Sequence, residues 1–177
     1  MRMSVMDAPA IEAPVLAKAV SNAFLQLGRQ DNIPISPLKL QKLVYFAHGW
    51  HLGLKNESLI GEPVLAWPYG PVVEDIYHEF KVFKDAPITR FAVLRDPGGD
   101  RFEPFVPSDD QFKNAVIGRV WQLYRDSTAS ELSTITHRRG SPWAQVTRDG
   151  HVQSRDLIIP NPLIVKYFAS KAKHAQT

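Results

Sequence analysis

The sequence predicts a mainly α-helical protein: a single helical domain with a small β-hairpin insertion. Apolar residues recur at three- and four-residue spacing in several segments, and Gly- and Pro-rich stretches separate these segments, as expected for amphipathic helices joined by loops. One segment, residues 37–54, is apolar around most of its circumference, which is typical of a helix at the centre of a domain. Only one stretch, around residues 96–100, has a clear β-hairpin pattern.

The first helix is expected over residues 15–27. Its apolar residues recur at helical spacing, and Gly28 is predicted to end it because glycine is favoured just past a helix C-terminus. The polar stretch 29–34 is then a loop. Residues 1–14 contain two prolines, one arginine and no long apolar run, so we interpret them as a flexible leader rather than a signal peptide.

The central helix is expected over residues 37–54. Ser36 and Pro37 form a start signal, because serine accepts from the free N–H groups of a first turn and proline suits the first helical position. Gly49 and Gly53 lower the helix propensity of this segment. We therefore expect them to allow the close approach of another element.

A turn-rich segment follows. Residues 56–71 are expected to be irregular, with a short strand over 64–67 and a turn at Pro68, Gly70 and Pro71. A helix over 72–83 should follow and face inward through Val73, Ile76, Tyr77 and Phe80. Residues 88–94 and 102–106 flank the sequence Asp-Pro-Gly-Gly-Asp and are predicted to form the β-hairpin.

The C-terminal third is predicted to be helical. Ser108 is expected to cap a helix that ends near residue 125, with its buried residues at Phe112, Val116, Val120, Leu123 and Tyr124. A shorter helix over 130–136, a turn starting at 141–143 and a final helix after residues 160–162 complete the fold. The predicted division is a leader (1–14), one domain (15–170) and a polar tail (171–177).

Composition excludes several classes of protein. The chain has no cysteine, which excludes disulfides, thiolate zinc sites and cysteine nucleophiles and favours a cytoplasmic location. No window holds eighteen uninterrupted apolar residues, so no membrane partner is expected. The net charge is only +3, and the basic residues are scattered among acidic ones. This distribution disfavours nucleic acid as a partner and leaves an acidic protein surface as a candidate.

Two histidines are the best candidates for chemistry. His48 and His51 lie three apart on the central helix and share a face, so a metal-dependent hydrolase is one alternative. The spacing is not that of a metalloprotease, and no third ligand follows at a recognisable distance. Ser133 and Ser141 near His137 lack a nucleophile turn and an acidic residue to orient the histidine. We therefore predict no catalytic residue, metal or cofactor.

Residues 67–72, Trp-Pro-Tyr-Gly-Pro-Val, form a rigid aromatic corner. Such a corner either covers the core or presents aromatic anchors to a partner, and both interpretations stay open. Lys39 and Lys42 stand near the start of the central helix, where the helix dipole disfavours cations. We expect them on a solvated rim, where an acidic neighbour or partner would offset this penalty.

These motifs resemble the SocA-like antitoxin family, also called the Panacea domain. Residues 38–52 resemble its signature helix, and residues 67–73 resemble its second signature, a tryptophan followed by Tyr-Gly-Pro-Val. Residues 132–137 and 142–143 match weaker downstream signals, and the resemblance covers roughly residues 16–168. The residues that carry it are Leu38, Lys39, Leu40, Gln41, Lys42, Leu43, Tyr45, Trp50, His51, Trp67, Gly70, Pro71, Val72, His137 and Trp143.

The resemblance implies an antitoxin that neutralises a cognate toxin protein by direct contact. In at least one branch of the family the antitoxin also serves as an adaptor that delivers its toxin to the ClpXP protease. The family motif implies no active site. A transcriptional regulator remains a further alternative, because some relatives carry an added DNA-binding domain, although the short leader leaves no room for one here. The residues expected to contact the toxin are Lys39, Lys42, Tyr45, Trp67 and Tyr69.

Overall fold

In the computed structural model, residues 12–148 and 150–175 are described, so most of the expected leader lies outside the described residues. The described chain is mainly helical and carries two small antiparallel hairpins, which confirms the predicted fold class. The elements run in the order α1 (Ala17–Asp31), α2 (Pro37–Lys55), β1 (Leu65–Trp67), β2 (Gly70–Val72), α3 (Glu74–Phe80), the 3-10 helix η1 (Lys81–Phe83), β3 (Leu94–Arg95), β4 (Arg101–Phe102), α4 (Gln111–Tyr124), α5 (Ala129–Thr136), α6 (Pro142–Val146) and α7 (Asn161–His174).

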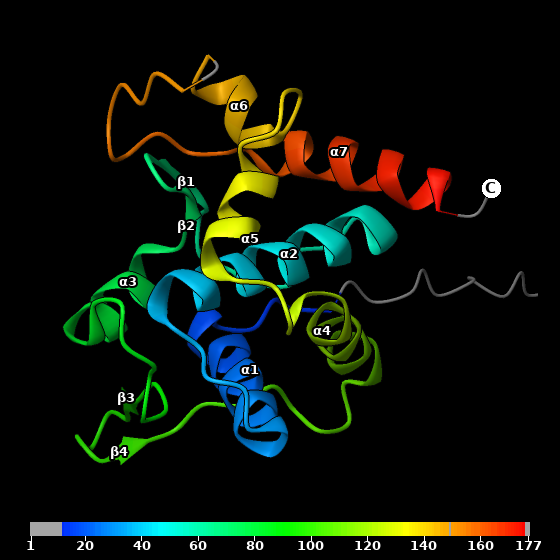
Figure 1. Ribbon diagram of the computed structural model, residues 1–177. Helices are drawn as coiled ribbons and strands as arrows, with labels where there is room; N and C mark the ends of the chain where they lie inside the picture. The colour runs from blue at the N-terminus through cyan, green and yellow to red at the C-terminus, as the bar shows by residue number, and fades with distance from the viewer. Residues whose placement is uncertain (1–11, 149, 176–177) are drawn as a thin grey trace, which may run out of the picture.

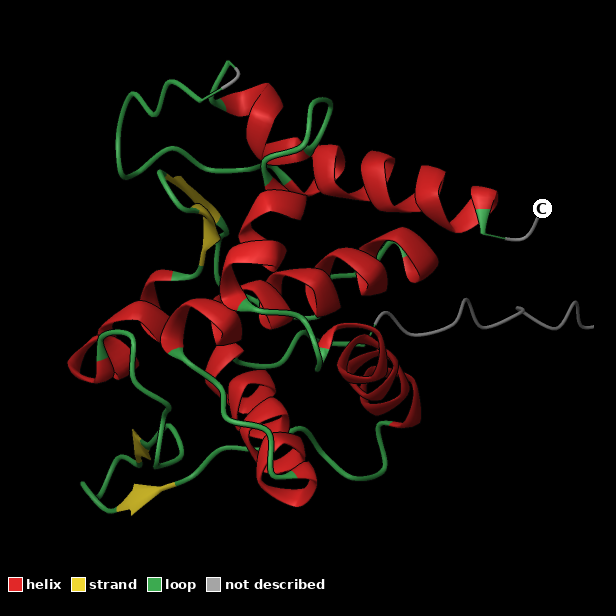
Figure 2. Cartoon of the chain, viewed as in Figure 1, coloured by secondary structure: helices red, strands yellow, loops and turns green. Residues whose placement is uncertain are grey.

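Helix α2 is the centre of the fold, as its apolar pattern predicts. Helix α7 lies along it, and α1, α4 and α5 pack on its other sides (Figure 1). The two hairpins lie at the edge of this helical body (Figure 2). Burial of α2 on several sides explains why its sequence lacks a clear polar face.

The ends of α2 follow from local chemistry. The Ser36 hydroxyl accepts from the Lys39 N–H at 3.4 Å and Pro37 occupies the first helical position, which confirms the predicted start. Asn56 ends the helix in the left-handed conformation with φ 56°. The helix is therefore delimited by the two residues that flank it.

Helix α7 approaches α2 closely because α2 offers two glycines at the contact. A Cβ atom on Gly49 would lie 2.3 Å from the Phe168 ring, and one on Gly53 would lie 2.7 Å from Phe168 Cβ. Real Cβ atoms do not approach other atoms so closely, so both positions require glycine in this packing. The expected close approach at Gly49 and Gly53 is thus confirmed.

The predicted end of the first helix is wrong. Gly28 is buried inside α1, which continues to Asp31, and Asn32 ends the helix with φ 55°. A Cβ on Gly28 would lie 2.8 Å from Ile35 Cδ1 and 2.9 Å from the Ile33 carbonyl oxygen. Gly28 therefore serves close packing of the following segment rather than helix termination.

The middle of the chain differs from the prediction in its boundaries. The short strand at 64–67 is confirmed as β1, but residues 70–72 form a strand instead of a turn followed by helix. Helix α3 therefore begins two residues later than expected and gives way to a 3-10 turn at residue 81. The second hairpin exists, although its strands have only two residues each.

Three further corrections concern the C-terminal helices. Helix α4 is capped by Asp110, whose side chain accepts from the Lys113 N–H, and not by Ser108. Leu123 was expected in the core but is 50% exposed. Helix α7 extends to His174, so the first residues of the expected polar tail are helical.

Candidate partner-binding site

Two buried side chains of α2 hold the strand β2. Gln41 Nε2 donates to the Val73 carbonyl oxygen and Gln41 Oε1 accepts from the Val73 N–H, each at 2.9 Å. The next residue is Lys42, whose Nζ donates to the Pro71 carbonyl oxygen at 3.0 Å. These bonds fix β2 against the centre of the fold, although Pro71 itself has no N–H to offer.

Lys42 is an unusual residue to bury. Its side chain is fully buried, and this burial lowers the pKa of its ammonium group to about 7. A charged or easily charged group in a dry site opposes folding unless it is paired, and its hydrogen-bond partner here is a neutral carbonyl. Lys42 therefore costs stability while it positions the hairpin.

The short helix α5 holds the turn of the same hairpin, which we call the anchor hairpin (residues 65–72). Ser133 Oγ donates to the Tyr69 carbonyl oxygen at 2.8 Å. The His137 ring bridges α5 and the turn, because Nε2 lies 3.0 Å from the Pro68 carbonyl oxygen and Nδ1 lies 2.6 Å from that of Ser133. The two-residue turn is thus held by side chains from outside the hairpin.

Helix α6 and a glycine complete this support. Trp143 Nε1 donates to the Trp67 carbonyl oxygen at 2.7 Å. Gly70 has φ +107°, and a Cβ there would lie 2.6 Å from Thr136 Oγ1 and 2.7 Å from Lys42 Nζ. Neither the backbone conformation nor the space at residue 70 allows another residue. Glycine there lets the side chains of α2 and α5 contact the hairpin directly.

The anchor hairpin presents aromatic surface. Tyr69 at its turn is 74% exposed. The half-buried Trp67 is fixed in orientation because its Nε1 donates to the Arg155 carbonyl oxygen at 2.9 Å and its ring meets Tyr77 edge-on at 4.8 Å. A groove of about 430 Å³, here called the hairpin groove, lies beside them and is lined by Pro37, Leu38, Gln41, Trp67, Pro68, Tyr69, Val72, Ile76, Tyr77, Lys81, Lys84, Asp85 and Arg155.

The hairpin groove combines aromatic side chains with positive charge. Lys81, Lys84 and Arg155 line it, against one carboxylate, Asp85. The Arg155 guanidinium lies 5.3 Å from the Trp67 ring centroid, within the range of a cation–π contact. Rigid aromatic residues and arginine are the residue types that dominate the binding energy of protein interfaces.

Comparison with known proteins assigns the family. Residues 40–144 match the family model described as antitoxin SocA-like, Panacea domain. The chain is also similar to Antitoxin SocA of Caulobacter vibrioides (strain NA1000 / CB15N), at 35% identity over 127 residues, or 72% of this chain and 68% of that protein. The chain belongs to the SocA-like antitoxin family. No solved structure matches it.

The support of the anchor hairpin lies within this Panacea domain. The matched segment is shorter than the expected 16–168 and leaves out α1 and α7, yet it contains the side chains of α2, α5 and α6 that bind the hairpin; the contact of Trp67 with Arg155 lies outside it. The motif residues are therefore mostly internal: they hold a turn in place rather than form a surface themselves. The side chains that do so are Gln41, Lys42, Ser133, His137 and Trp143.

Three of the five residues nominated for toxin contact are buried. Lys39 Nζ donates to the Arg125 carbonyl oxygen, and burial lowers the pKa of Lys39. Lys42 lies under the anchor hairpin, so the expected solvated rim is wrong for both lysines. Tyr45 is also in the core, where burial raises the pKa of its hydroxyl.

The other two nominated residues, Trp67 and Tyr69, lie together at the turn of the anchor hairpin. Sequence reasoning placed Tyr77 inward, but it is 38% exposed and lines the hairpin groove. The helical spacing of four and seven from Tyr77 would have placed two cations on its face. Sequence reasoning missed three cations of the groove. Lys81 and Lys84 were missed because Tyr77 was expected to face inward, and Arg155 was missed because it is distant in sequence.

The two histidines of α2 are engaged separately. His48 Nε2 lies 3.1 Å from Asn161 Oδ1, and its Nδ1 accepts from the Ile60 N–H at 3.4 Å, so the lone pair of the ring is used. His51 Nδ1 donates to the Glu57 carbonyl oxygen at 2.7 Å. Burial lowers the pKa of His48 to about 4, and it also lowers that of His51.

Two other kinds of site are absent from the described residues. Among residues 12–148 and 150–175, no three His, Asp or Glu side chains gather closely enough to hold a metal ion. None of the helices in the described part of the chain combines the length and apolar character needed to cross a bilayer.

Proposed function

We propose that this chain is an antitoxin that neutralises a cognate toxin protein in the cytoplasm by binding it directly through the anchor hairpin and the hairpin groove. The observation that carries the proposal is the exposure of Tyr69 at the turn of a hairpin whose carbonyl oxygens are bound by side chains from α2, from α6 and from α5 with its C-terminal cap. Membership of the SocA-like family supplies the class of partner.

Rigidity is what makes this turn suitable for binding. A turn held by several side-chain hydrogen bonds has little conformational freedom left to lose when a partner binds, so more of the contact energy becomes affinity. Tyr69 and Trp67 are large and stiff, which is typical of residues at the centre of an interface. A stable complex buries roughly 1,200–2,000 Å² in total, so the partner must also cover the surface around the groove.

The charge of the hairpin groove specifies the partner surface. Lys81, Lys84 and Arg155 outnumber the one acidic residue, Asp85. We expect an acidic patch on the toxin at this position, because complementary charge speeds association and suppresses wrong partners. In the finer form of the proposal, which rests on the family resemblance, the bound toxin is delivered to the ClpXP protease.

Co-expression with the product of the neighbouring open reading frame tests the proposal. The neighbour should arrest growth alone, and the wild-type chain should restore growth and co-purify with it. Tyr69→Ala should lose both effects. Phe102→Ala, which removes a 47% exposed aromatic from the other hairpin, should keep both. A harmless neighbour, or rescue without co-purification, contradicts direct neutralisation.

The same assay separates the two modes of neutralisation. Rescue that persists in a strain lacking ClpXP indicates occlusion of the toxin surface. Rescue that occurs only when the protease is present indicates delivery. In the second case the toxin level should fall on co-expression, whereas simple occlusion leaves the toxin level unchanged.

A further inference from the structure

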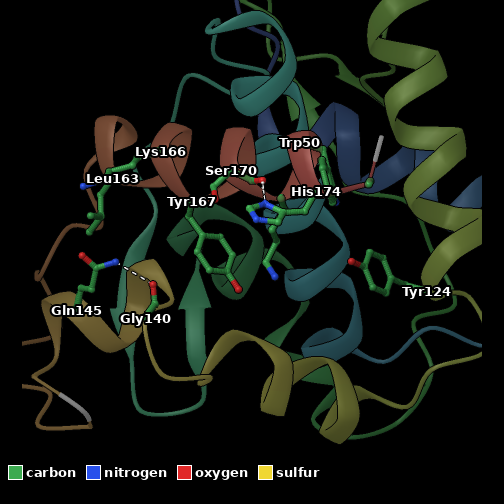
Figure 3. Close-up of a pocket in the computed structure, with 11 residues that line it drawn as sticks. Trp50, Tyr124, Gly140, Gln145, Leu163, Lys166, Tyr167, Ser170 and His174 are labelled. Atoms are coloured by element: carbon green, nitrogen blue, oxygen red, sulfur yellow. Dashed lines mark hydrogen bonds between the residues drawn. The ribbon is translucent and has the colours of Figure 1, made fainter. Parts of the chain in front are cut away.

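A second and larger groove lies on the far side of α5 from the anchor hairpin. It has a volume of about 730 Å³ and runs along α7; we call it the α7 groove (Figure 3). Its walls come from α2, α4, α6, α7 and the segment that joins α5 to α6. The residues that line it are Trp50, Tyr124, Gly140, Gln145, Leu163, Lys166, Tyr167, Ser170, Lys171, His174 and Ala175.

The lining of the α7 groove is cationic. Lys166 and Lys171 belong to it, and a smaller adjoining cavity of about 230 Å³, which shares Trp50, Tyr124, Tyr167 and Lys171, adds Arg138. No aspartate or glutamate lines either space. The ion pairs found among the described residues do not involve these three cations. Their charge is therefore available to an anionic ligand.

Neutral hydrogen-bond donors stand among these cations. The hydroxyl groups of Tyr124 and Tyr167 point toward the middle of the groove in Figure 3. Burial raises the pKa of Tyr124, so its hydroxyl keeps its proton and remains a donor at neutral pH. Ammonium groups together with protonated hydroxyls form a donor set suited to carboxylates.

The length of the groove suits an extended peptide. Its lining along α7 runs from Leu163 to His174, which at 1.5 Å per residue is about 16 Å. A peptide in β conformation advances about 3.3 Å per residue, so about five residues cover this distance. Alternate side chains of such a peptide point to the same side and can reach Lys166 and Lys171 in turn.

We propose that the α7 groove binds a short, extended, acidic peptide segment of a partner protein. The site is separate from the anchor hairpin, and the proposal does not depend on the toxin being bound there. Aspartate or glutamate side chains of the segment would pair with Lys166, Lys171 and Arg138. Its apolar side chains would contact Trp50 and Leu163.

The aromatic residues of the groove favour a peptide over a single-stranded nucleic acid. Base stacking requires open ring faces. Here the Tyr124 ring is stacked on Phe46 at 4.6 Å, and Lys171 Nζ lies over the Tyr167 ring at 4.8 Å. One face of each of these two rings is therefore already occupied, which leaves less ring surface for stacking by a base. The low net charge of the whole chain, +3, points the same way.

Fluorescence anisotropy with labelled hexapeptides tests the inference on the full chain. The probes are a panel in which three glutamates alternate with leucine, tyrosine or serine, together with the same peptides carrying glutamine and a thymidine hexanucleotide. At least one acidic peptide should bind, binding should weaken as salt rises, and the glutamine version should bind at least tenfold more weakly. Failure of every acidic peptide to bind at about 1 mM overturns the proposal.

Charge reversal locates the binding site. The double variant Lys166→Glu with Lys171→Glu should weaken peptide binding at least tenfold. Lys173→Glu is the matched control, because Lys173 is exposed on the same helix but does not line the groove, and it should leave affinity within twofold. Both positions of the double variant are exposed, and circular dichroism checks that it folds. Equal effects of the two variants, or tighter binding of the oligonucleotide than of any peptide, overturn the assignment.

Discussion

Replacing Lys42 by methionine should stabilise the protein at neutral pH and impair its function. The side chain is fully buried, and burial lowers the pKa of its ammonium group from 10.5 to about 7. A difference of about 3.5 pH units corresponds to about 4–5 kcal/mol of unfavourable free energy at pH 7. Methionine removes this term but leaves the Pro71 carbonyl oxygen without its donor, which costs about 1–3 kcal/mol. The net gain at pH 7 is therefore about 1–4 kcal/mol.

The pH dependence of stability shows whether the lowered pKa of Lys42 causes the gain. Below pH 10.5 the unfolded lysine binds a proton, whereas the folded lysine binds one only below about pH 7. The unfolded state thus holds more protons between these values, so the stability of the wild type rises with pH there by up to about 1.4 kcal/mol per pH unit. Between pH 7 and pH 9 the Lys42 contribution amounts to about 2 kcal/mol. The advantage of Lys42→Met should shrink by this amount.

Urea unfolding of both proteins at pH 7 and pH 9, followed by circular dichroism, measures the effect. Because Lys39 and other groups are common to both proteins, the difference between them isolates Lys42. Parallel changes in the stability of the two proteins from pH 7 to pH 9 would refute the argument. The variant should also bind the toxin more weakly, because β2 loses one of the side-chain bonds that hold it to α2.

Four further substitutions test the packing and the buried histidine. Gly49→Ala should lower the free energy of unfolding by about 1–3 kcal/mol, because the new Cβ would lie 2.3 Å from the Phe168 ring. Gly118→Ala in α4 is the control: no atom lies within 4 Å of the new Cβ, so stability should rise by about 0.5–1 kcal/mol. Urea unfolding measures both changes. Gly70→Ala should cost more than about 1 kcal/mol and abolish rescue, since it combines a clash with φ +107°. The wild type should lose about 3 kcal/mol of stability between pH 6.5 and pH 4 through His48. The folded state keeps this ring neutral down to about pH 4, whereas the unfolded state protonates it near pH 6.5. The His48→Gln variant should lack this loss.

Each of these changes has an outcome that contradicts its reasoning. Equal effects of alanine at residues 49 and 118 would mean that α7 does not pack closely on α2. A Gly70→Ala protein that still neutralises would show that the turn needs no fixed conformation. A His48 resonance in nuclear magnetic resonance that titrates near pH 6.5 would mean that the ring is open to water.

The central helix was predictable because its signals are local. Ser36 and Pro37 specify the start of α2 from two adjacent residues, and the apolar pattern around the helix identifies it as the centre. The two glycines that admit α7 were also recognisable, since Gly49 and Gly53 weaken the helix without ending it. In each case the information lies within a few turns of one element.

The failures share a different cause, which is packing between distant segments. Gly28 has the sequence character of a helix stop, but the side chain of Ile35 requires a glycine there. Lys39 and Lys42 have the character of surface residues, yet carbonyl oxygens of residues 125 and 71 bind them in the interior. The hairpin groove needs Arg155, more than 80 residues from Trp67, and no local pattern indicates that contact.

The most direct test of the proposed function is the affinity of the purified chain for its toxin, measured by titration calorimetry with wild type, Tyr69→Ala and Phe102→Ala. If the anchor hairpin is the centre of the interface, Tyr69→Ala should lose about 2 kcal/mol or more, about a 30-fold rise in Kd, with unchanged unfolding. Phe102→Ala should bind within twofold of wild type, because this residue lies on the other hairpin. Unchanged affinity of Tyr69→Ala, or an equal loss in both variants, would contradict the proposal.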